Sequence, residues 1–133
     1  MAFLLISGHA GGKLKKKLID EQEIVMNFAD ILAEAYIAES LLMRVQKLSE
    51  KADHDKKEYE VQRKLLKLHL YEALAKVRKA GNDAIESYAE GFDRKTVAYF
   101  LKVLTPKMNV NPKELRRAVA NYAIEKNDYP FVM

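Results

Sequence analysis

An apolar stripe of seven residues, spaced alternately four and three apart, runs from Ile24 to Val45 and constrains the fold more than any other feature. This spacing keeps the side chains on one side of an α-helix. The stripe consists of Ile24, Phe28, Ile31, Ala35, Ala38, Leu42 and Val45. A second stripe at similar spacing consists of Leu66, Leu70, Ala73, Val77, Ala80, Ala84 and Tyr88. Because such stripes are stable only when covered, they predict two long helices that pack along their lengths.

Composition supports a helical protein and excludes several classes of function. The 133 residues are enough for one domain, with only five glycines and three prolines. There is no cysteine, which rules out a disulfide framework, a thiolate nucleophile and a cysteine-ligated metal. The net charge of +4 comes from 23 basic and 19 acidic residues that are interleaved along the sequence. A nucleic-acid-binding protein usually carries a patch of one sign, so we expect no nucleic-acid partner.

Residues 1–19 show no sustained apolar period, and we expect them to form a flexible leader or linker. Three glycines at positions 8, 11 and 12 precede a cluster of lysines at positions 13 and 15–17. The apolar run Phe3–Ile6 is too short for a signal peptide, and the lysines follow it where a signal peptide would have them first. No segment approaches the roughly 20 apolar residues that cross a bilayer. We therefore expect a cytoplasmic protein, peripheral at most to a membrane.

The first long helix is expected from Asp20, whose carboxylate can cap it, to Leu48. A polar connection at 49–53 then predicts an antiparallel second helix, which begins near 53–55 and runs to Glu90. Gly91 is suited to the left-handed residue that ends this helix. Gly81 lies inside it, at a cost of only about 1 kcal/mol, and the stripe stays in register across it. The alternative is that Gly81 ends the helix, with Asp83 capping a new one and Glu86 completing a capping box. We expect one continuous helix, with or without a bend at the glycine.

Two shorter helices are expected after Gly91. One begins at Asp93 and is stopped by Pro106, and the next has Asn111 as its N-cap, Pro112 in its first turn and Glu114 to complete a capping box. The last residues, 129–131, either fold back onto the bundle or fray. Together these features predict an all-α protein: residues 20–133 form an antiparallel bundle of about four helices built on a long helical hairpin.

No catalytic, cofactor-binding or metal-binding residue can be assigned from the sequence. A di-metal centre in a helical bundle needs glutamates and a Glu followed three residues later by His. Neither His54 nor His69 has a glutamate three positions before it, and His9 lies in the expected leader. We therefore read His54 as a solvated turn residue and His69 as a residue at the edge of the second stripe.

Glu39 is the one carboxylate that projects among apolar residues of the first long helix. A buried carboxylate without a partner is costly, so a cation should lie next to it. If the hairpin turns near Lys51, Arg63 lies at the same level on the second helix. We predict an ion pair between Glu39 and Arg63 with a structural role, and the alternative is a catalytic base at Glu39. Lys64, Lys67, Arg78 and Lys79 are expected on a solvated face, with contact to anionic lipid as the alternative.

Three segments resemble, in pattern and order, the extra C-terminal helical domain of acyl-CoA dehydrogenases, especially the tail of the very-long-chain type. The first is QEIVMNFADILAEAYIAESLLMRVQKL, from Gln22 to Leu48. The second is KLLKLHLYEALAKVRKAGNDAIESY on the second helix, and the third is the ending NYAIEKNDYPF. The resemblance covers about Asp20 to Phe131.

The resemblance implies an FAD-dependent flavoenzyme that removes a proton and a hydride from adjacent carbons of a fatty acyl-CoA. The flavin-contacting loops, the segment with the catalytic glutamate and the middle β-domain of that family have no counterpart in this sequence. We therefore expect a non-catalytic C-terminal domain, inactive by itself, with the catalytic domains of the same enzyme as its partner. The resemblance further implies dimer contacts and contact with a membrane surface. The alternatives are an independent helical interaction or adaptor module and a small enzyme that uses Glu39.

Overall fold

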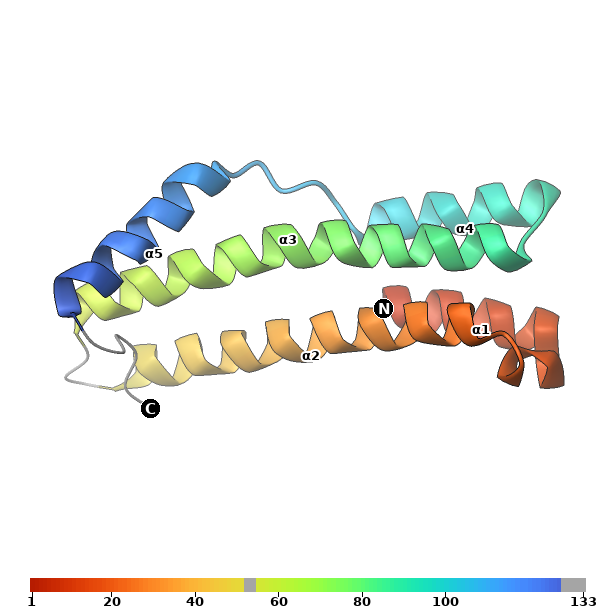
Figure 1. The fold of residues 1–133 in the computed structure, drawn as a ribbon, viewed down its shortest axis with the longest axis horizontal. Helices are drawn as coiled ribbons and strands as arrows, with labels where there is room; N and C mark the ends of the chain where they lie inside the picture. The colour runs from red at the N-terminus through yellow and green to blue at the C-terminus, as the bar shows by residue number, and fades with distance from the viewer. Residues whose placement is uncertain (52–54, 128–133) are drawn as a thin grey trace. The chain divides into compact units, whose positions relative to one another are not determined.

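The computed structural model describes residues 1–51 and 55–127 of the chain. Within these ranges the chain forms five α-helices and one short 3₁₀ helix, and no strand (Figure 1). The elements are α1 (Ala2–Leu14), η1 (Lys15–Ile19), α2 (Gln22–Glu50), α3 (Lys56–Tyr88), α4 (Gly91–Leu104) and α5 (Pro112–Lys126). The predicted all-α class is confirmed, and α2 and α3, the helices that carry the two stripes, are the main contacting pair.

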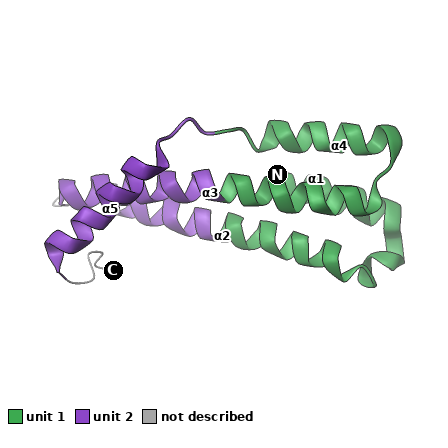
Figure 2. Ribbon diagram, turned by 45° about the horizontal axis from the view of Figure 1, so that its top comes forward, with its two compact units in different colours: residues 1–36, 73–107 green, residues 37–72, 108–133 purple. Residues whose placement is uncertain are grey.

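The chain divides into two compact units, each made of two separate stretches of sequence (Figure 2). Unit 1 comprises Met1–Tyr36 and Ala73–Lys107. It contains α1, η1, α4, the first half of α2 and the second half of α3. Unit 2 comprises Ile37–Glu72 and Met108–Met133, and so contains the other halves of α2 and α3 together with α5. Residue 19, where the sequence predicted a domain boundary, lies inside unit 1.

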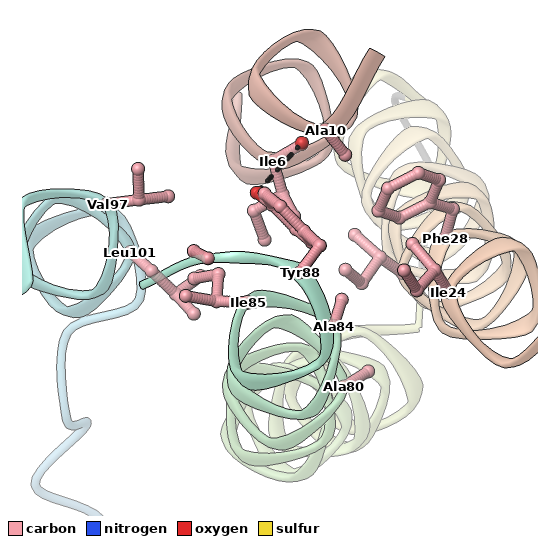
Figure 3. Packing of buried hydrophobic residues seen from close by; sticks show 12 residues of the cluster. Ile6, Ala10, Ile24, Phe28, Ala80, Ala84, Ile85, Tyr88, Val97 and Leu101 are labelled. Atoms are coloured by element: carbon pink, nitrogen blue, oxygen red, sulfur yellow. Dashed lines mark hydrogen bonds between the residues drawn. The ribbon is translucent and has the colours of Figure 1, made fainter. Parts of the chain in front are cut away.

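The core of unit 1 lies where side chains from α1, α2, α3 and α4 meet (Figure 3). Ile6 and Leu101 are completely buried, and Ile24 and Ile85 are 1% exposed. The full cluster is Ile6, Ala10, Ile24, Phe28, Ile31, Ala80, Ala84, Ile85, Tyr88, Ala89, Val97 and Leu101. Four helices thus share one apolar core, to which α3 contributes the small residues Ala80 and Ala84 beside the larger Ile85 and Tyr88.

The flexible leader predicted for residues 1–19 is wrong for Ala2–Leu14, which form α1. Ile6 and Ala10 are fully buried in the core of unit 1, and Phe3 packs edge-on against Phe28, with ring centroids 6.1 Å apart. The prediction gave weight to the glycines, which lower helix propensity. Burial of one face outweighs that cost, because most helical stability in a protein comes from packing.

Gly81 lies inside the continuous helix α3, so the predicted continuity is confirmed. A Cβ atom at this position would lie 2.7 Å from Cδ2 of Leu101 and 2.8 Å from Cδ1 of Ile6. Both distances are far shorter than ordinary van der Waals contact. The glycine is therefore needed for the close approach of α3 to α1 and α4, which the sequence analysis did not anticipate.

The predicted boundaries of the later helices agree with the structure in part. Gly91 has the predicted positive φ, 57°, but it is the first residue of α4. Helix α3 ends at Tyr88 and α4 begins two residues before the predicted Asp93. Leu104 ends α4 two residues before Pro106. The side-chain oxygen of Asn111 accepts a hydrogen bond from the backbone N–H of Glu114 at 3.3 Å, and Pro112 is the first residue of α5. These residues act through local backbone chemistry, which makes them readable from sequence.

In unit 2, the paired halves of α2 and α3 bury Val45, Val61 and Leu66 between them and their neighbours. Helix α5 adds Tyr122, which is 3% exposed. Three ion pairs join α5 to residues at or near α3: Lys57 with Glu125 at 2.6 Å, Arg116 with Glu72 at 2.5 Å, and Lys126 with Asp55 at 3.9 Å. The predicted fold-back of residues 129–131 and the prediction for His54 lie outside the described residues.

The second stripe is buried or half-buried along its whole length. The first stripe is only partly covered: Ile24, Phe28, Ile31 and Val45 are buried, whereas Ala35 is exposed and Leu42 is 46% exposed. The prediction that this whole side of α2 is buried is therefore wrong in its middle section.

Candidate functional site

Glu39 is exposed, so its predicted position among covered apolar residues is wrong. The guanidinium of Arg63 contacts Glu60 of its own helix at 3.1 Å and lies over the ring of Tyr59, 5.6 Å from its centroid. The ion pair predicted between Glu39 and Arg63 stays a prediction.

The register of the hairpin differs from the one expected. The turn was predicted near Lys51, whereas α2 continues to Glu50 and α3 begins only at Lys56. A later turn moves every residue of α3 to a level nearer the end of α2. Gln62, the neighbour of Arg63, lines a groove together with Arg44, Lys47 and Leu48.

The sheltered carboxylate on α2 is Glu34, in unit 1. Its side chain is 13% exposed, and its Oε1 atom lies 2.6 Å from Nζ of Lys76 on α3. This pair was not predicted, because a helical wheel gives only the approximate direction of the Glu34 side chain. Its partner on α3 also depends on the register between the two helices. This ion pair joins α2 to α3 within unit 1.

Tyr88 and His9 form a polar contact at the margin of the unit 1 core. The hydroxyl of Tyr88 lies 3.2 Å from Nδ1 of His9 and donates to the carbonyl oxygen of Ile6 at 3.4 Å (Figure 3). Burial raises the pKa of Tyr88 to about 12, so the phenol is neutral near pH 7. These contacts fasten α1 to the end of α3. The third candidate histidine, His69, is half-buried on α3.

The structure shows no metal site or transmembrane helix within the part of the chain that it describes. No group of three or more His, Asp or Glu side chains there could hold a metal ion. No helix among these residues is both long and apolar enough to cross a bilayer.

In unit 1, α4 carries five large apolar side chains that are exposed in addition to its buried residues Val97 and Leu101. We call this surface the α4 outer face and define it by Phe92, Tyr99, Phe100, Val103 and Leu104. Their exposed fractions are 82%, 64%, 48%, 56% and 38%, in that order. The rings of Tyr99 and Phe100 meet edge to face, with centroids 5.8 Å apart. Exposed aromatic side chains in one row are typical of a binding surface.

Lysines flank the α4 outer face on one side. Lys95 and Lys102 are both exposed and lie one to two turns apart on α4. By contrast, two of the four basic residues expected on the solvated face of α3 make contacts within unit 1: Arg78 donates to Thr105 at 3.1 Å, and Lys79 pairs with Asp83 at 2.5 Å. Helix α4 therefore combines exposed lysines with exposed apolar side chains.

Unit 2 has a groove of about 320 Å³ at the end of its helical pair. Its lining residues are Ser40, Met43, Arg44, Lys47, Leu48, Lys51 and Gln62. Three of the seven are cations and none is acidic. We call it the unit 2 groove.

Comparison with known proteins identifies the family. The model of the family described as "Acyl-CoA dehydrogenase, C-terminal domain" matches residues 1–103. The match includes α1 and η1, which the resemblance noted in the sequence did not cover, and ends within α4. A comparison with curated proteins found no match. The helical architecture and the match over most of its length place this chain in the acyl-CoA dehydrogenase C-terminal domain family.

Proposed function

We propose that this chain is the non-catalytic C-terminal helical domain of an FAD-dependent enzyme that oxidises fatty acyl-CoA. We further propose that it supports assembly of that enzyme, with the catalytic domains as its partner. Family membership supports the first part, because family enzymes depend on FAD. The order of the three resembling segments favours the very-long-chain type.

The observation that carries the assembly role is the α4 outer face. Five large apolar side chains of α4 are exposed, although α4 also has an inner face that is packed in the core of unit 1. A surface of this kind stays in contact with water only at a cost of roughly 25 cal/mol for each Å² of apolar area. Covering it with another part of the enzyme removes that cost, and the aromatic residues supply the anchors that dominate interfaces.

The first test is to read the gene upstream of this sequence. An in-frame or adjacent catalytic portion of an acyl-CoA dehydrogenase is expected. The two parts should then co-purify when expressed together, or share one polypeptide. An unrelated neighbouring gene, together with a chain that captures no catalytic portion, would contradict the proposal.

A double substitution tests the surface itself. Phe100→Ser with Val103→Ser on the α4 outer face should weaken association with the catalytic portion at least about tenfold, since each lost anchor typically costs 1–2 kcal/mol or more. If this chain and the catalytic portion form one polypeptide, the measurement is how readily the enzyme loses its bound flavin. Ile124→Ser is the matched control, because Ile124 is 75% exposed in unit 2. Equal effects of the two variants would show that the α4 outer face is not the contact.

Contact with a membrane surface is a second candidate role for α4. Lysines beside exposed aromatic residues are typical of helices that lie in a lipid interface. Co-sedimentation with phosphatidylserine vesicles at low salt, compared with phosphatidylcholine vesicles, tests this role. The membrane role is supported if Lys102→Gln and the double substitution both reduce the amount of chain that sediments with phosphatidylserine vesicles. If equal amounts sediment with phosphatidylcholine vesicles, the lysines do not contribute to binding. A second copy of the chain is another candidate partner for the α4 outer face. Light scattering of the purified chain tests whether such a homodimer forms.

A further inference from the structure

Helix α2 carries exposed apolar residues in unit 1, in addition to its buried ones. Ile24 and Phe28 point into the core of unit 1 (Figure 3). Three large apolar residues of the same helix are exposed, Val25 at 45%, Met26 at 67% and Leu32 at 47%. Together with two exposed alanines they form a set that we call the α2 exposed stripe: Val25, Met26, Ala29, Leu32 and Ala33. Because a helix that is apolar on more than one side is typically covered on each of them, this stripe is a candidate contact surface.

The spacing of the α2 exposed stripe fits contact along another helix. Val25, Ala29 and Leu32 are four and three residues apart. Met26, Ala29 and Ala33 are three and four residues apart, so the two rows lie next to each other on the helix surface. From Val25 to Ala33 the stripe is about 12 Å long, which is slightly more than two helical turns. The central alanine offers only a methyl group, so the axis of a partner helix can approach to about 8 Å.

Carboxylates lie along one edge of the α2 exposed stripe. Glu23 and Asp30 are exposed, and they lie three residues before Met26 and Ala33, respectively. Residues three apart are neighbours on a helix surface, so both carboxylates border the stripe. The sequence between Glu21 and Met43 contains no Lys, Arg or His. The helix that carries the stripe therefore supplies acidic side chains to its border and no basic ones.

Helix α3 supplies cations near Asp30, and these are engaged within unit 1. Lys76 and Lys79 line one pocket with Asp30. Lys76 pairs with Glu34 at 2.6 Å, and Lys79 pairs with Asp83 at 2.5 Å. The pocket contains these two lysines and three carboxylates, so one negative charge is in excess. This edge of the stripe therefore attracts cationic side chains, and it repels anionic lipid headgroups or a second copy of the same stripe.

We propose that the α2 exposed stripe binds a helix of the catalytic portion, one whose own apolar stripe is flanked by Lys or Arg. The apolar residues of the two helices cover each other, and the cations lie beside Glu23 and Asp30. This inference rests on the assembly role proposed above and gives that role a second surface. The charge beside the stripe is opposite to that of Lys95 and Lys102 on α4. Surfaces of opposite charge select different partner helices, which fixes the orientation of unit 1 on the enzyme.

Thiol labelling measures whether the α2 exposed stripe is covered. The chain has no cysteine, so Ala29→Cys introduces one thiol at the centre of the stripe. Its rate of reaction with a maleimide is compared between the 133-residue chain and the complete enzyme, and mass spectrometry identifies the labelled peptide. The rate at position 29 should fall at least about tenfold in the enzyme, because the core of an interface excludes water. Leu4→Cys is the matched control, since Leu4 is 64% exposed on α1, and its rate should be equal in both.

A photoreactive maleimide on the same thiol identifies the partner. The cross-linked peptide should come from the catalytic portion and should carry Lys or Arg beside apolar residues at helical spacing. A cross-link to a second copy of the chain, or to a peptide without cations, would overturn the inference.

A charge variant tests the chemistry of the partner. In the complete enzyme carrying Ala29→Cys, Asp30→Asn should raise the labelling rate about two- to fivefold, as expected for the loss of one partly exposed ion pair. High salt should act in the same direction, since exposed charges are screened. Glu50→Gln is the matched control, because Glu50 is an exposed acid at the other end of α2, in unit 2. Equal rates in the two variants would contradict a cationic partner at Asp30.

Val103→Cys separates this inference from the assembly role. If position 103 on the α4 outer face is protected in the enzyme and position 29 is not, the assembly role holds and the inference about α2 is wrong. If neither position is protected, both proposals are wrong. Protection at both positions, together with the expected cross-link, supports both.

Discussion

At the scale of single residues, position 81 needs a residue without a side chain. We predict that Gly81→Leu lowers the free energy of unfolding by about 2–3 kcal/mol, because the new side chain must displace Ile6 and Leu101, both fully buried. Urea unfolding followed by circular dichroism measures this. Gly12→Ala is the control: it is a helical glycine with open space at its Cβ position, and alanine there should raise stability by up to about 1 kcal/mol. Equal stability of Gly81→Leu and the parent chain would contradict the close packing.

Lys15 is a non-glycine residue with a positive φ of 50°, at the junction of α1 and η1. Side chains are strained in such backbone conformations by about 1–3 kcal/mol, whereas glycine is not. Lys15→Gly should therefore leave stability unchanged or raise it by up to about 1 kcal/mol. Lys16→Gly removes the same charge one residue later and should lower stability by about 0.5–1 kcal/mol. Thermal unfolding of the two variants side by side measures the difference, and the reverse order would refute the strain at Lys15.

The raised pKa of Tyr88 leads us to expect that the free energy of unfolding falls at alkaline pH. Its pKa is raised by burial to about 12, while the unfolded chain titrates near 10. The stabilisation is therefore complete below pH 10 and is lost as the pH rises toward 12, by about 2 kcal/mol. Tyr88→Phe should flatten this part of the stability profile, relative to Tyr99→Phe, whose ring is 64% exposed. Urea unfolding between pH 8 and 11 measures the slopes, and parallel slopes for both variants would assign the decline to other groups.

At the scale of elements, α1 is the helix whose removal should weaken unit 1 most directly. We predict that Ile6→Ala lowers the free energy of unfolding by about 2–4 kcal/mol, since Ile6 is completely buried between α1, α3 and α4. Leu4→Ala is the matched control on the same helix, at 64% exposure, and should change stability by less than about 0.5 kcal/mol. Hydrogen exchange of the α1 amides provides a second measurement. Similar losses in both variants would mean that α1 does not dock through Ile6.

The elements also show which parts of the fold can be predicted from sequence. The long helices, the positive φ of Gly91 and the N-cap at Asn111 could be predicted, because periodicity and backbone chemistry are local properties. Helix α1 was missed, although Ala2, Ile6, Ala10 and Leu14 recur every fourth residue. That signal is weak because three glycines interrupt it. Whether these residues are buried also depends on the helices that pack against α1 in the folded unit.

The pairing of charged residues could not be predicted, for a geometric reason. A small error in the position of the hairpin turn shifts the register between α2 and α3 and changes every cross-helix partner. The predicted pair of Glu39 with Arg63 depends on this register, and the observed pair of Glu34 with Lys76 was not predicted. The unit 2 groove depends on the same register, because Gln62 of α3 must lie level with Arg44 of α2.

At the scale of the whole molecule, the acidic side chains that came closest to a catalytic arrangement have other roles. Glu39 is exposed to water, Glu34 pairs with Lys76, and Tyr88 is a neutral phenol hydrogen-bonded at the core. A general base needs a tuned pKa and a positioned substrate, and the described part of the chain places none of these groups beside the unit 2 groove.

We therefore predict that the purified 133-residue chain does not oxidise dodecanoyl-CoA, even with added FAD and an artificial electron acceptor. The measurement is acceptor reduction over time, beside a flavin absorbance spectrum of the purified chain. Adding the chain to its catalytic portion should raise the activity or stability of that portion, and Phe100→Ser with Val103→Ser should diminish this gain. Turnover by the chain alone that disappears in Glu39→Gln or Glu34→Gln would show that one of these carboxylates is catalytic, and the non-catalytic role proposed for the domain would be wrong.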